Sequence, residues 1–126
     1  MNNQLSNSQT NKKFDLEERT ARFAEAIIDL MRKIPDSTIN RRMIEQVVGC
    51  GGSLGANYCE ASEGESKRDF IHKMGICIKE TKETKHWLRL LARANPEFTE
   101  EFRLLWKEAQ ELLLIFSAII RKSKNK

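Results

Sequence analysis

Proline and glycine are scarce in this chain. Its 126 residues include two prolines and six glycines, and four of the glycines fall between Gly49 and Gly55. No stretch approaches the roughly twenty consecutive apolar residues that a membrane-spanning helix needs. Segments rich in Leu, Ile, Glu, Lys and Arg fill the rest of the sequence, and such segments favour helices over strands. The sequence therefore predicts an all-α protein of one domain that makes no contact with membranes.

Cysteines are few and odd in number. Cys50, Cys59 and Cys77 cannot all form pairs, and the N-terminal residues lack the apolar stretch of a secretion signal. Both features predict free thiols in a reducing cytoplasm. The formal net charge of +4 allows a polyanionic partner without requiring one.

Residues 1–13 are polar and predict a disordered leader. Four later segments place apolar side chains every three or four residues, which is the period of an amphipathic helix. Pro35 closes the first segment. Asp36, Ser37 and Thr38 offer side-chain oxygens suited to cap the second, and Ser66 is suited to cap the third. The predicted helices cover approximately residues 14–34, 36–64, 66–94 and 95–122, and a basic tail of residues 123–126 follows.

Each predicted helix carries one apolar seam. Four helices with short connections bury such seams together as a four-helix bundle with helices packed about 20° apart. The predicted fold is an antiparallel up-down-up-down four-helix bundle. Two helical hairpins exchanged between chains would produce the same pattern, and the sequence leaves that alternative open.

The glycine-rich stretch VVGCGGSLGANYCEA, residues 47–61, has the composition of a phosphate-binding loop. Neither common motif fits: a dinucleotide fingerprint needs glycine where Leu54 stands, and a P-loop needs lysine after its last glycine, where Ala56 stands. In a helix, each interior glycine costs up to about 1 kcal/mol relative to alanine. Close approach of another helix, within the bundle or from a second subunit, would offset that cost. The residues predicted to form this interface are Gly49, Gly52, Ser53, Gly55, Ala56, Asn57, Tyr58 and Glu60.

The segment GSLGANYCEASEGESKRDFIHKMGICIKETKETKHWLRLL, residues 52–91, closely resembles the four helix bundle protein family, also called 23S rRNA intervening-sequence proteins. The resemblance extends from Asp15 to about Lys122. Upstream it rests on Asp15-Leu16, Arg19-Thr20 and Phe23-Ala24, and downstream on Glu108-Ala109 and Glu111-Leu112.

The resemblance implies a bundle that assembles as a ring-like homopentamer in the cytoplasm, with no assigned enzymatic activity. It also implies kinship with the accessory protein of diversity-generating retroelements, a basic pentamer that binds nucleic acid and a reverse transcriptase. Two departures stand out. Residues 50–53 read Cys-Gly-Gly-Ser where members often have Ser-Gly-Thr-Ser, and Cys59 stands where arginine is common.

One face of the third predicted helix is basic. Its residues follow one another at steps of three or four, and every charged member is positive. We call this face the basic stripe; it comprises Arg68, His72, Gly75, Lys79, Lys82, His86, Arg89 and Arg93. Solvated faces usually mix charges of both signs, so a polyanion-binding surface is the alternative to a merely solvated face. The predicted nucleic-acid-binding residues are Arg68, Lys79, Lys82, His86, Arg89 and Arg93, with Arg121 and Lys122 near the C-terminus.

Metal and catalytic chemistry have little support in the sequence. Glu83 and His86 have the Glu-x-x-His spacing of di-iron bundles, but a full site needs a second pair, and His72 lies about 21 Å away along the same helix. Cys50 and Cys59 have no Cys-x-x-Cys spacing, so the cysteines are predicted to be small buried side chains. We predict no metal site, no cofactor and no enzymatic activity.

Aromatic side chains are candidates for stacking on nucleic-acid bases. Tyr58, Trp87 and Trp106 are available, but both tryptophans adjoin apolar seams and are predicted to lie in the core or in an interface. The predicted function is therefore that of a non-enzymatic oligomer that binds the RNA or DNA backbone through the basic stripe and the C-terminal tail. The alternative is a protein-interaction or structural ring whose basic face docks an acidic protein, such as a co-encoded enzyme.

Overall fold

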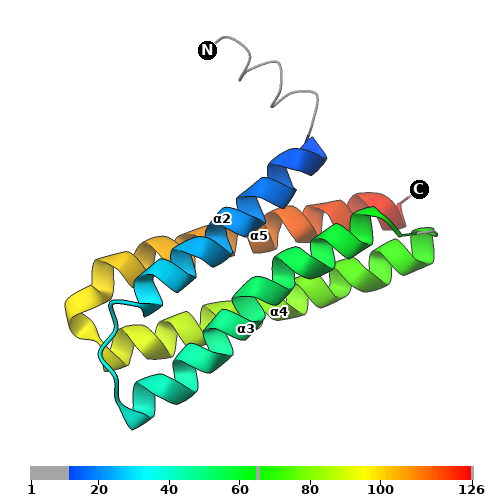
Figure 1. Ribbon diagram of the computed structural model, residues 1–126. Helices are drawn as coiled ribbons and strands as arrows, with labels where there is room; N and C mark the ends of the chain where they lie inside the picture. The colour runs from blue at the N-terminus through cyan, green and yellow to red at the C-terminus, as the bar shows by residue number, and fades with distance from the viewer. Residues whose placement is uncertain (1–11, 65, 126) are drawn as a thin grey trace, which may run out of the picture.

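The computed structural model describes residues 12–64 and 66–125, and this part of the chain is helical throughout apart from its connections. Its elements are α2 (Lys12–Met31), α3 (Thr38–Ser62), α4 (Lys67–Ala94), the 3-10 turn η1 (Pro96–Phe98) and α5 (Thr99–Lys124). The four long helices lie side by side, each joined to the next at one end (Figure 1). The prediction of an all-α, four-helix architecture is confirmed.

The helix boundaries follow from capping residues. Ser37 and Ser66 have extended backbones, and each side-chain oxygen accepts a hydrogen bond from a backbone N–H three residues later, at 3.0 Å. Asn95 ends α4, and Pro96 begins η1, where its missing N–H costs nothing. The Ser66 cap is therefore confirmed, and Ser37 is the one of the three candidates Asp36, Ser37 and Thr38 that caps α3.

The chain differs from the sequence prediction at its two ends. α2 begins at Lys12, inside the predicted leader, and the rest of that leader, residues 1–11, lies outside the described part of the chain. At the other end, α5 continues to Lys124, beyond the predicted start of the tail at residue 123. Basic side chains in the last turn suit a helix C-terminus because they face the negative end of its dipole.

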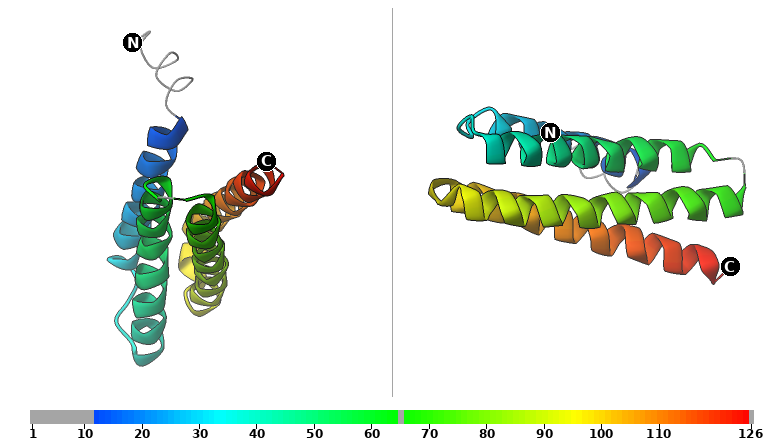
Figure 2. Two further views of the ribbon diagram at one scale, coloured as in Figure 1. Left: turned by 90° about the vertical axis from the view of Figure 1, so that its right-hand side faces the viewer. Right: turned by 90° about the horizontal axis from the view of Figure 1, so that it is seen from below.

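The helices form an unequal bundle. α4 packs extensively against α3 and α5, and α2 packs against α3, but α2 has little contact with α5. Figure 2 shows the α2–α3 pair standing beside the α4–α5 pair. No helix in the described part of the chain is both long and apolar enough to cross a membrane.

The four predicted seams meet in one core. Almost every seam residue is buried, and only Phe70, Phe98 and Ile119, which lie toward the ends of their helices, are half-buried. The buried seam residues are Leu16, Thr20, Phe23, Ile27, Leu30 and Ile34 on α2 and its C-terminal turn; Met43, Val47, Cys50, Leu54, Tyr58 and Ala61 on α3; Met74, Cys77, Thr81, Thr84, Leu88 and Leu91 on α4; and Phe102, Leu105, Ala109, Leu112 and Phe116 on α5.

Polar groups inside the core are satisfied. The hydroxyl of Thr81 donates to the Cys77 carbonyl of its own helix at 2.7 Å, and Thr20 does the same to Leu16 at 2.8 Å. Asn40 and Asn95 exchange two amide hydrogen bonds of 3.0 and 2.9 Å. This reciprocal pair fixes the start of α3 against the end of α4.

Candidate nucleic-acid interface

The basic stripe lies on the outer face of α4. All eight of its members are exposed, whereas the seam on the other side of the helix is buried from Met74 to Leu91. α4 has no proline, so the stripe runs along a continuous helix. From Arg68 to Arg93 the stripe is about 38 Å long at about 1.5 Å per residue, close to one turn of duplex DNA.

Neighbouring carboxylates do not neutralise the stripe. Lys73 lies on α4 but off the stripe, and its Nζ pairs with Glu60 of α3 at 2.8 Å. By contrast, five cationic side chains of the stripe form no ion pair with any residue in 12–64 or 66–125; they are Arg68, Lys79, Lys82, Arg89 and Arg93. These five side chains are therefore exposed without a direct carboxylate contact in the described part of the chain.

The carboxylates of α4 lie beside the stripe rather than on it. Asp69 and Glu80 are half-buried, while Glu83 is exposed. Burial, together with the adjacent Glu83, raises the pKa of Glu80 above its ordinary value. Glu83 is thus the one exposed carboxylate that the described part of α4 presents near the basic side chains.

The two predicted C-terminal contacts are also exposed. Arg121 and Lys122 lie in the last turns of α5. Figures 1 and 2 show this end of α5 at the same end of the molecule as the start of α4, where Arg68 lies. Arg121, Lys122 and the first turn of the basic stripe therefore lie at the same end of the bundle.

The glycine-rich stretch is part of α3, and its small residues face two directions. Gly51 and Gly55 face α2: a Cβ added at Gly55 would lie 2.9 Å from the Thr20 hydroxyl oxygen, and one at Gly51 would lie 2.6 Å from the end of Ile27. Gly49 and Gly52 face outward, and an added Cβ would meet nothing within 4 Å. Close packing within the bundle therefore accounts for two glycines of the stretch and leaves two on an open face.

The remaining predicted interface residues are divided between the core and the surface. Ala56 is exposed beside Gly52, and Ser53 is half-buried. The Asn57 amide donates to the Ser53 carbonyl at 2.8 Å, and the Tyr58 ring is buried with its centroid 6.0 Å from that of Phe116. Glu60 makes the ion pair with Lys73 already described. The outward-facing residues Gly49, Gly52 and Ala56 are called the small α3 face below.

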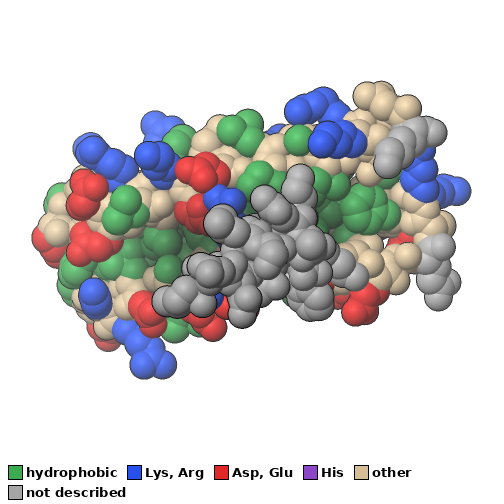
Figure 3. Space-filling model, turned by 90° about the horizontal axis from the view of Figure 1, so that it is seen from above, with side chains coloured by type: hydrophobic (Ala, Val, Ile, Leu, Met, Phe, Trp, Pro, Cys, Tyr) green, Lys and Arg blue, Asp and Glu red, His purple; other side chains and the backbone are tan. Residues whose placement is uncertain are grey.

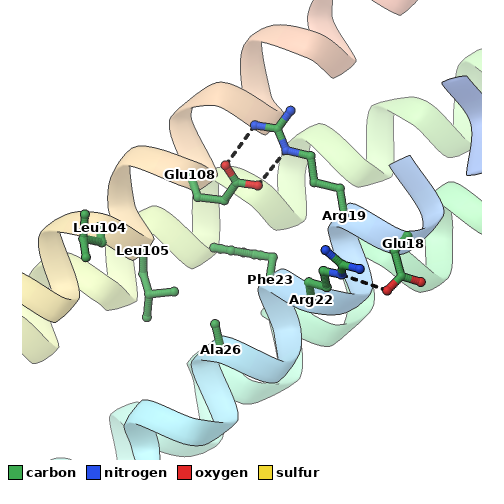
Figure 4. A pocket seen from close by; sticks show the side chains of 8 residues that line it. All are labelled: Glu18, Arg19, Arg22, Phe23, Ala26, Leu104, Leu105 and Glu108. Carbon is green, nitrogen blue, oxygen red and sulfur yellow. Dashed lines mark hydrogen bonds and ion pairs between the residues drawn. The ribbon is translucent and has the colours of Figure 1, made fainter. Parts of the chain in front are cut away.

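A groove separates α2 from α5. Hydrophobic side chains are visible between the two helices, with charged ones along both sides (Figure 3). The groove has a volume of about 520 Å³, and its apolar lining includes Phe23 and Leu104. Arg19 crosses it and donates to both carboxylate oxygens of Glu108 at 2.7 and 2.9 Å (Figure 4). Arg19 also donates to Glu111 at 2.8 Å. This arrangement fastens α2 to α5, and the two carboxylates raise the pKa of Arg19.

Comparison with known proteins agrees with this architecture. The family model described as "23S rRNA-intervening sequence protein" matches residues 12–118, from the start of α2 into the second half of α5. This chain belongs to the 23S rRNA-intervening sequence protein family. A solved structure of a protein with unknown function from the S23 ribosomal protein family of Bacteroides thetaiotaomicron is 30% identical, with a TM-score of 0.72, and the match covers 83% of this chain and 97% of that one. No curated protein matches the chain.

The resemblance inferred from the sequence is thus confirmed, and the structure explains some of the residues that carried it. In this chain, Arg19, Glu108 and Glu111 form the connection across the α2–α5 groove. This contact was not predicted from the sequence. One sequence feature could have predicted it: all three residues are among those shared with the family, and they lie on the first and last helices.

The thiols of this chain lie in two environments. Cys50 and Cys77 are buried, and burial raises the pKa of both, that of Cys77 to about 12. Cys59 is exposed on the outer side of α3, so the prediction that the cysteines are buried is wrong for Cys59. The reason is rotation along the helix: Cys59 follows the buried Tyr58 and points about 100° away from it.

The structure also shows where the Glu-x-x-His pair and the aromatic residues lie. Within the described residues, no group of three or more His, Cys, Asp or Glu side chains could hold a metal ion. His86 is exposed, and its ring lies 5.1 Å from that of the half-buried Trp87. Trp106 has 41% of its surface exposed in the single chain, so it is not a core residue.

Proposed function

We propose that this protein is a non-enzymatic, oligomeric up-down-up-down bundle that binds the phosphate backbone of RNA or DNA through the basic stripe. One observation carries the proposal: five exposed cationic side chains follow one face of α4 for about 38 Å without a carboxylate partner in the described chain. Contacts between such side chains and phosphates supply affinity without reading sequence. The family description names an intervening sequence of 23S rRNA but no ligand, so the proposal rests on the charge arrangement.

The small α3 face supports assembly into a ring. The resemblance to the family implies that this ring has five subunits. Gly49 and Gly52 have open space beyond them, and exposed glycines inside a helix cost stability unless something packs on them. A helix from a second copy would approach closely at this position. Five copies of the basic stripe would then act on one polyanion, and effective concentration would raise the affinity above that of a single copy.

Charge reversal on the stripe tests the binding surface. The double variant Lys79→Glu with Lys82→Glu is expected to abolish retention of a structured RNA, while light scattering shows an assembly of unchanged mass. The matched control is Lys33→Glu with Lys107→Glu, which changes the net charge equally at exposed positions on α5 and just after α2. The control is expected to keep most of the affinity.

Two outcomes would oppose this assignment. Equal loss of binding in both double variants would mean that affinity follows net charge rather than the α4 face. Full retention of RNA by the Lys79→Glu, Lys82→Glu variant would remove the basic stripe from nucleic-acid binding. The stripe would then be assigned to docking an acidic protein partner.

Assembly is tested separately on the small α3 face. Gly52→Leu places a large side chain where the single chain has open space, so the monomer should fold while the oligomer dissociates. Light scattering gives the mass and circular dichroism gives the helix content. A full-size oligomer carrying Gly52→Leu would contradict this interface.

A further inference from the structure

A second hollow lies between α4 and α5, next to the basic stripe. Its volume of about 410 Å³ falls within the range of small-ligand pockets, about 300–1,000 Å³. Leu88, Ala92 and Phe102 give it an apolar floor, and Trp106 forms one wall. Arg89 and Arg103 also line the pocket, and no carboxylate does.

The Trp106 ring is held in position from outside this pocket. The ammonium of Lys85 lies 4.4 Å from the ring centroid, and Lys85 also bonds the side-chain oxygen of Gln110 on α5. Trp106 lines the hollow and Lys85 does not, so the cation–π contact is made outside the set of residues that line the pocket. An exposed aromatic ring fixed beside an apolar floor is a stacking platform for a flat ring.

The positive charges of the two arginines determine which kind of planar ligand suits the pocket. Arg89 belongs to the basic stripe and has no ion pair, while Arg103 has only a loose contact, 4.0 Å, with the exposed Glu100. A ligand that offers a planar apolar ring together with negative charge complements this lining. A nucleobase joined to phosphates has both properties, whereas an acidic peptide lacks the planar ring.

We propose that the Trp106 pocket takes one unpaired base of a nucleic-acid strand whose backbone lies along the basic stripe. This inference rests on the proposed function and makes it more specific: the preferred ligand is single-stranded or looped rather than fully duplex. Arg89 is the link, because it belongs to both surfaces. A base inside a duplex is stacked on both sides and cannot reach the pocket without leaving the helix.

The fluorescence of Trp106 tests this assignment. In a Trp87→Phe background the chain has a single tryptophan, so quenching reports on the pocket alone. Titration with a 12-nucleotide single strand is expected to quench Trp106 over the same concentrations at which anisotropy detects binding. A 12-base-pair duplex of the same sequence should bind without quenching.

Variants then separate the pocket from the stripe. Trp106→Leu is expected to weaken single-strand binding at least about fivefold, the lower end of what one stacked base contributes, and to leave duplex affinity within twofold. Leu114→Ala, at another exposed apolar residue of α5, is the control and should change neither. Circular dichroism verifies that both variants fold.

Each contrary outcome has its own meaning. Suppose that duplex and single strand bind equally, that neither quenches Trp106, and that Trp106→Leu has no effect. The pocket would then not be a base-binding site, while the proposed role of the basic stripe would stand. Quenching by adenosine monophosphate as strong as that by the strand would assign the pocket to a free nucleotide and overturn the proposed strand. Failure of every nucleic acid to bind at low salt would overturn the proposed function, and this inference with it.

Discussion

Single residues set the chemistry of the core. Burial raises the pKa of Cys77 from an ordinary 9.0 to about 12, so this thiol remains protonated and unreactive at neutral pH. Cys50, whose sulfur accepts a hydrogen bond from Thr84 at 3.2 Å, shifts in the same direction. Both thiols therefore behave as small apolar side chains.

The Cys77 thiol predicts a loss of stability in alkali. Its folded-state pKa is raised, so its contribution is complete below pH 9 and is lost as the pH rises from about 9 to about 12. Each proton released on unfolding lowers the free energy of unfolding by up to ~1.4 kcal/mol per pH unit. Urea denaturation at pH 7, 9 and 10 should show a shallower decline for Cys77→Ala than for the unaltered protein. Identical declines would contradict the shifted thiol.

Two glycines in similar helical positions should respond oppositely to the same substitution. Gly75→Ala on α4 meets open space and should raise the free energy of unfolding by up to ~1 kcal/mol through helix propensity. Gly55→Ala places a methyl group 3.1 Å from the Thr20 Cβ and should lower it by ~1–2 kcal/mol. Thermal melts followed by circular dichroism measure both. Equal stabilisation would mean that α2 does not approach α3 at Gly55.

At the scale of elements, the bundle is held unevenly. α4 is central, while α2 depends on its contact with α3 and on Arg19 across the α2–α5 groove. Two other arginines form exposed pairs within or beside their own helices, Arg22 with Glu18 and Arg41 with Asp36. Only Arg19 joins the first helix to the last through an ion pair in the described chain.

Removal of Arg19 should loosen α2. Arg19→Ala removes the bidentate partner of Glu108. We expect the free energy of unfolding to fall by ~1–2 kcal/mol; solvent limits the loss because both side chains are about 30% exposed. Arg22→Ala removes an exposed pair four residues apart and should cost only a few tenths of a kcal/mol. Hydrogen exchange should report faster opening of α2 in Arg19→Ala alone. Equal effects of the two variants would contradict the role of Arg19.

The sequence predicted the elements well because each carried its own local signals. Serine caps, Pro35 and Pro96, and seams repeating every three or four residues do not depend on the rest of the fold. The α2–α5 groove and the placement of the glycines depend instead on how the helices are rotated against each other. Periodicity marked the buried seam of α3, but it did not show that Gly55 faces α2 while Gly52 faces outward.

For the molecule as a whole, charge is the distinguishing property. The sequence identified the basic stripe because helical spacing alone puts its members on one face, and the structure places all of them in solvent. The Trp106 pocket could not be predicted from the sequence, since it needs Arg89 of α4 to line the same hollow as Arg103 and Trp106 of α5. Only the packing of the two helices brings these residues together.

The measurement that tests the central claim most directly is the salt dependence of nucleic-acid binding. Labelled structured RNA and duplex DNA are titrated with protein of known assembly mass, and anisotropy is followed at several salt concentrations. A backbone-binding stripe predicts a logarithmic slope of about −0.9 for each duplex phosphate contacted, hence about −3.6 or steeper for four or more contacts. Flat titrations with no binding at low salt would contradict the account and leave the α4 face as a surface for an acidic protein partner.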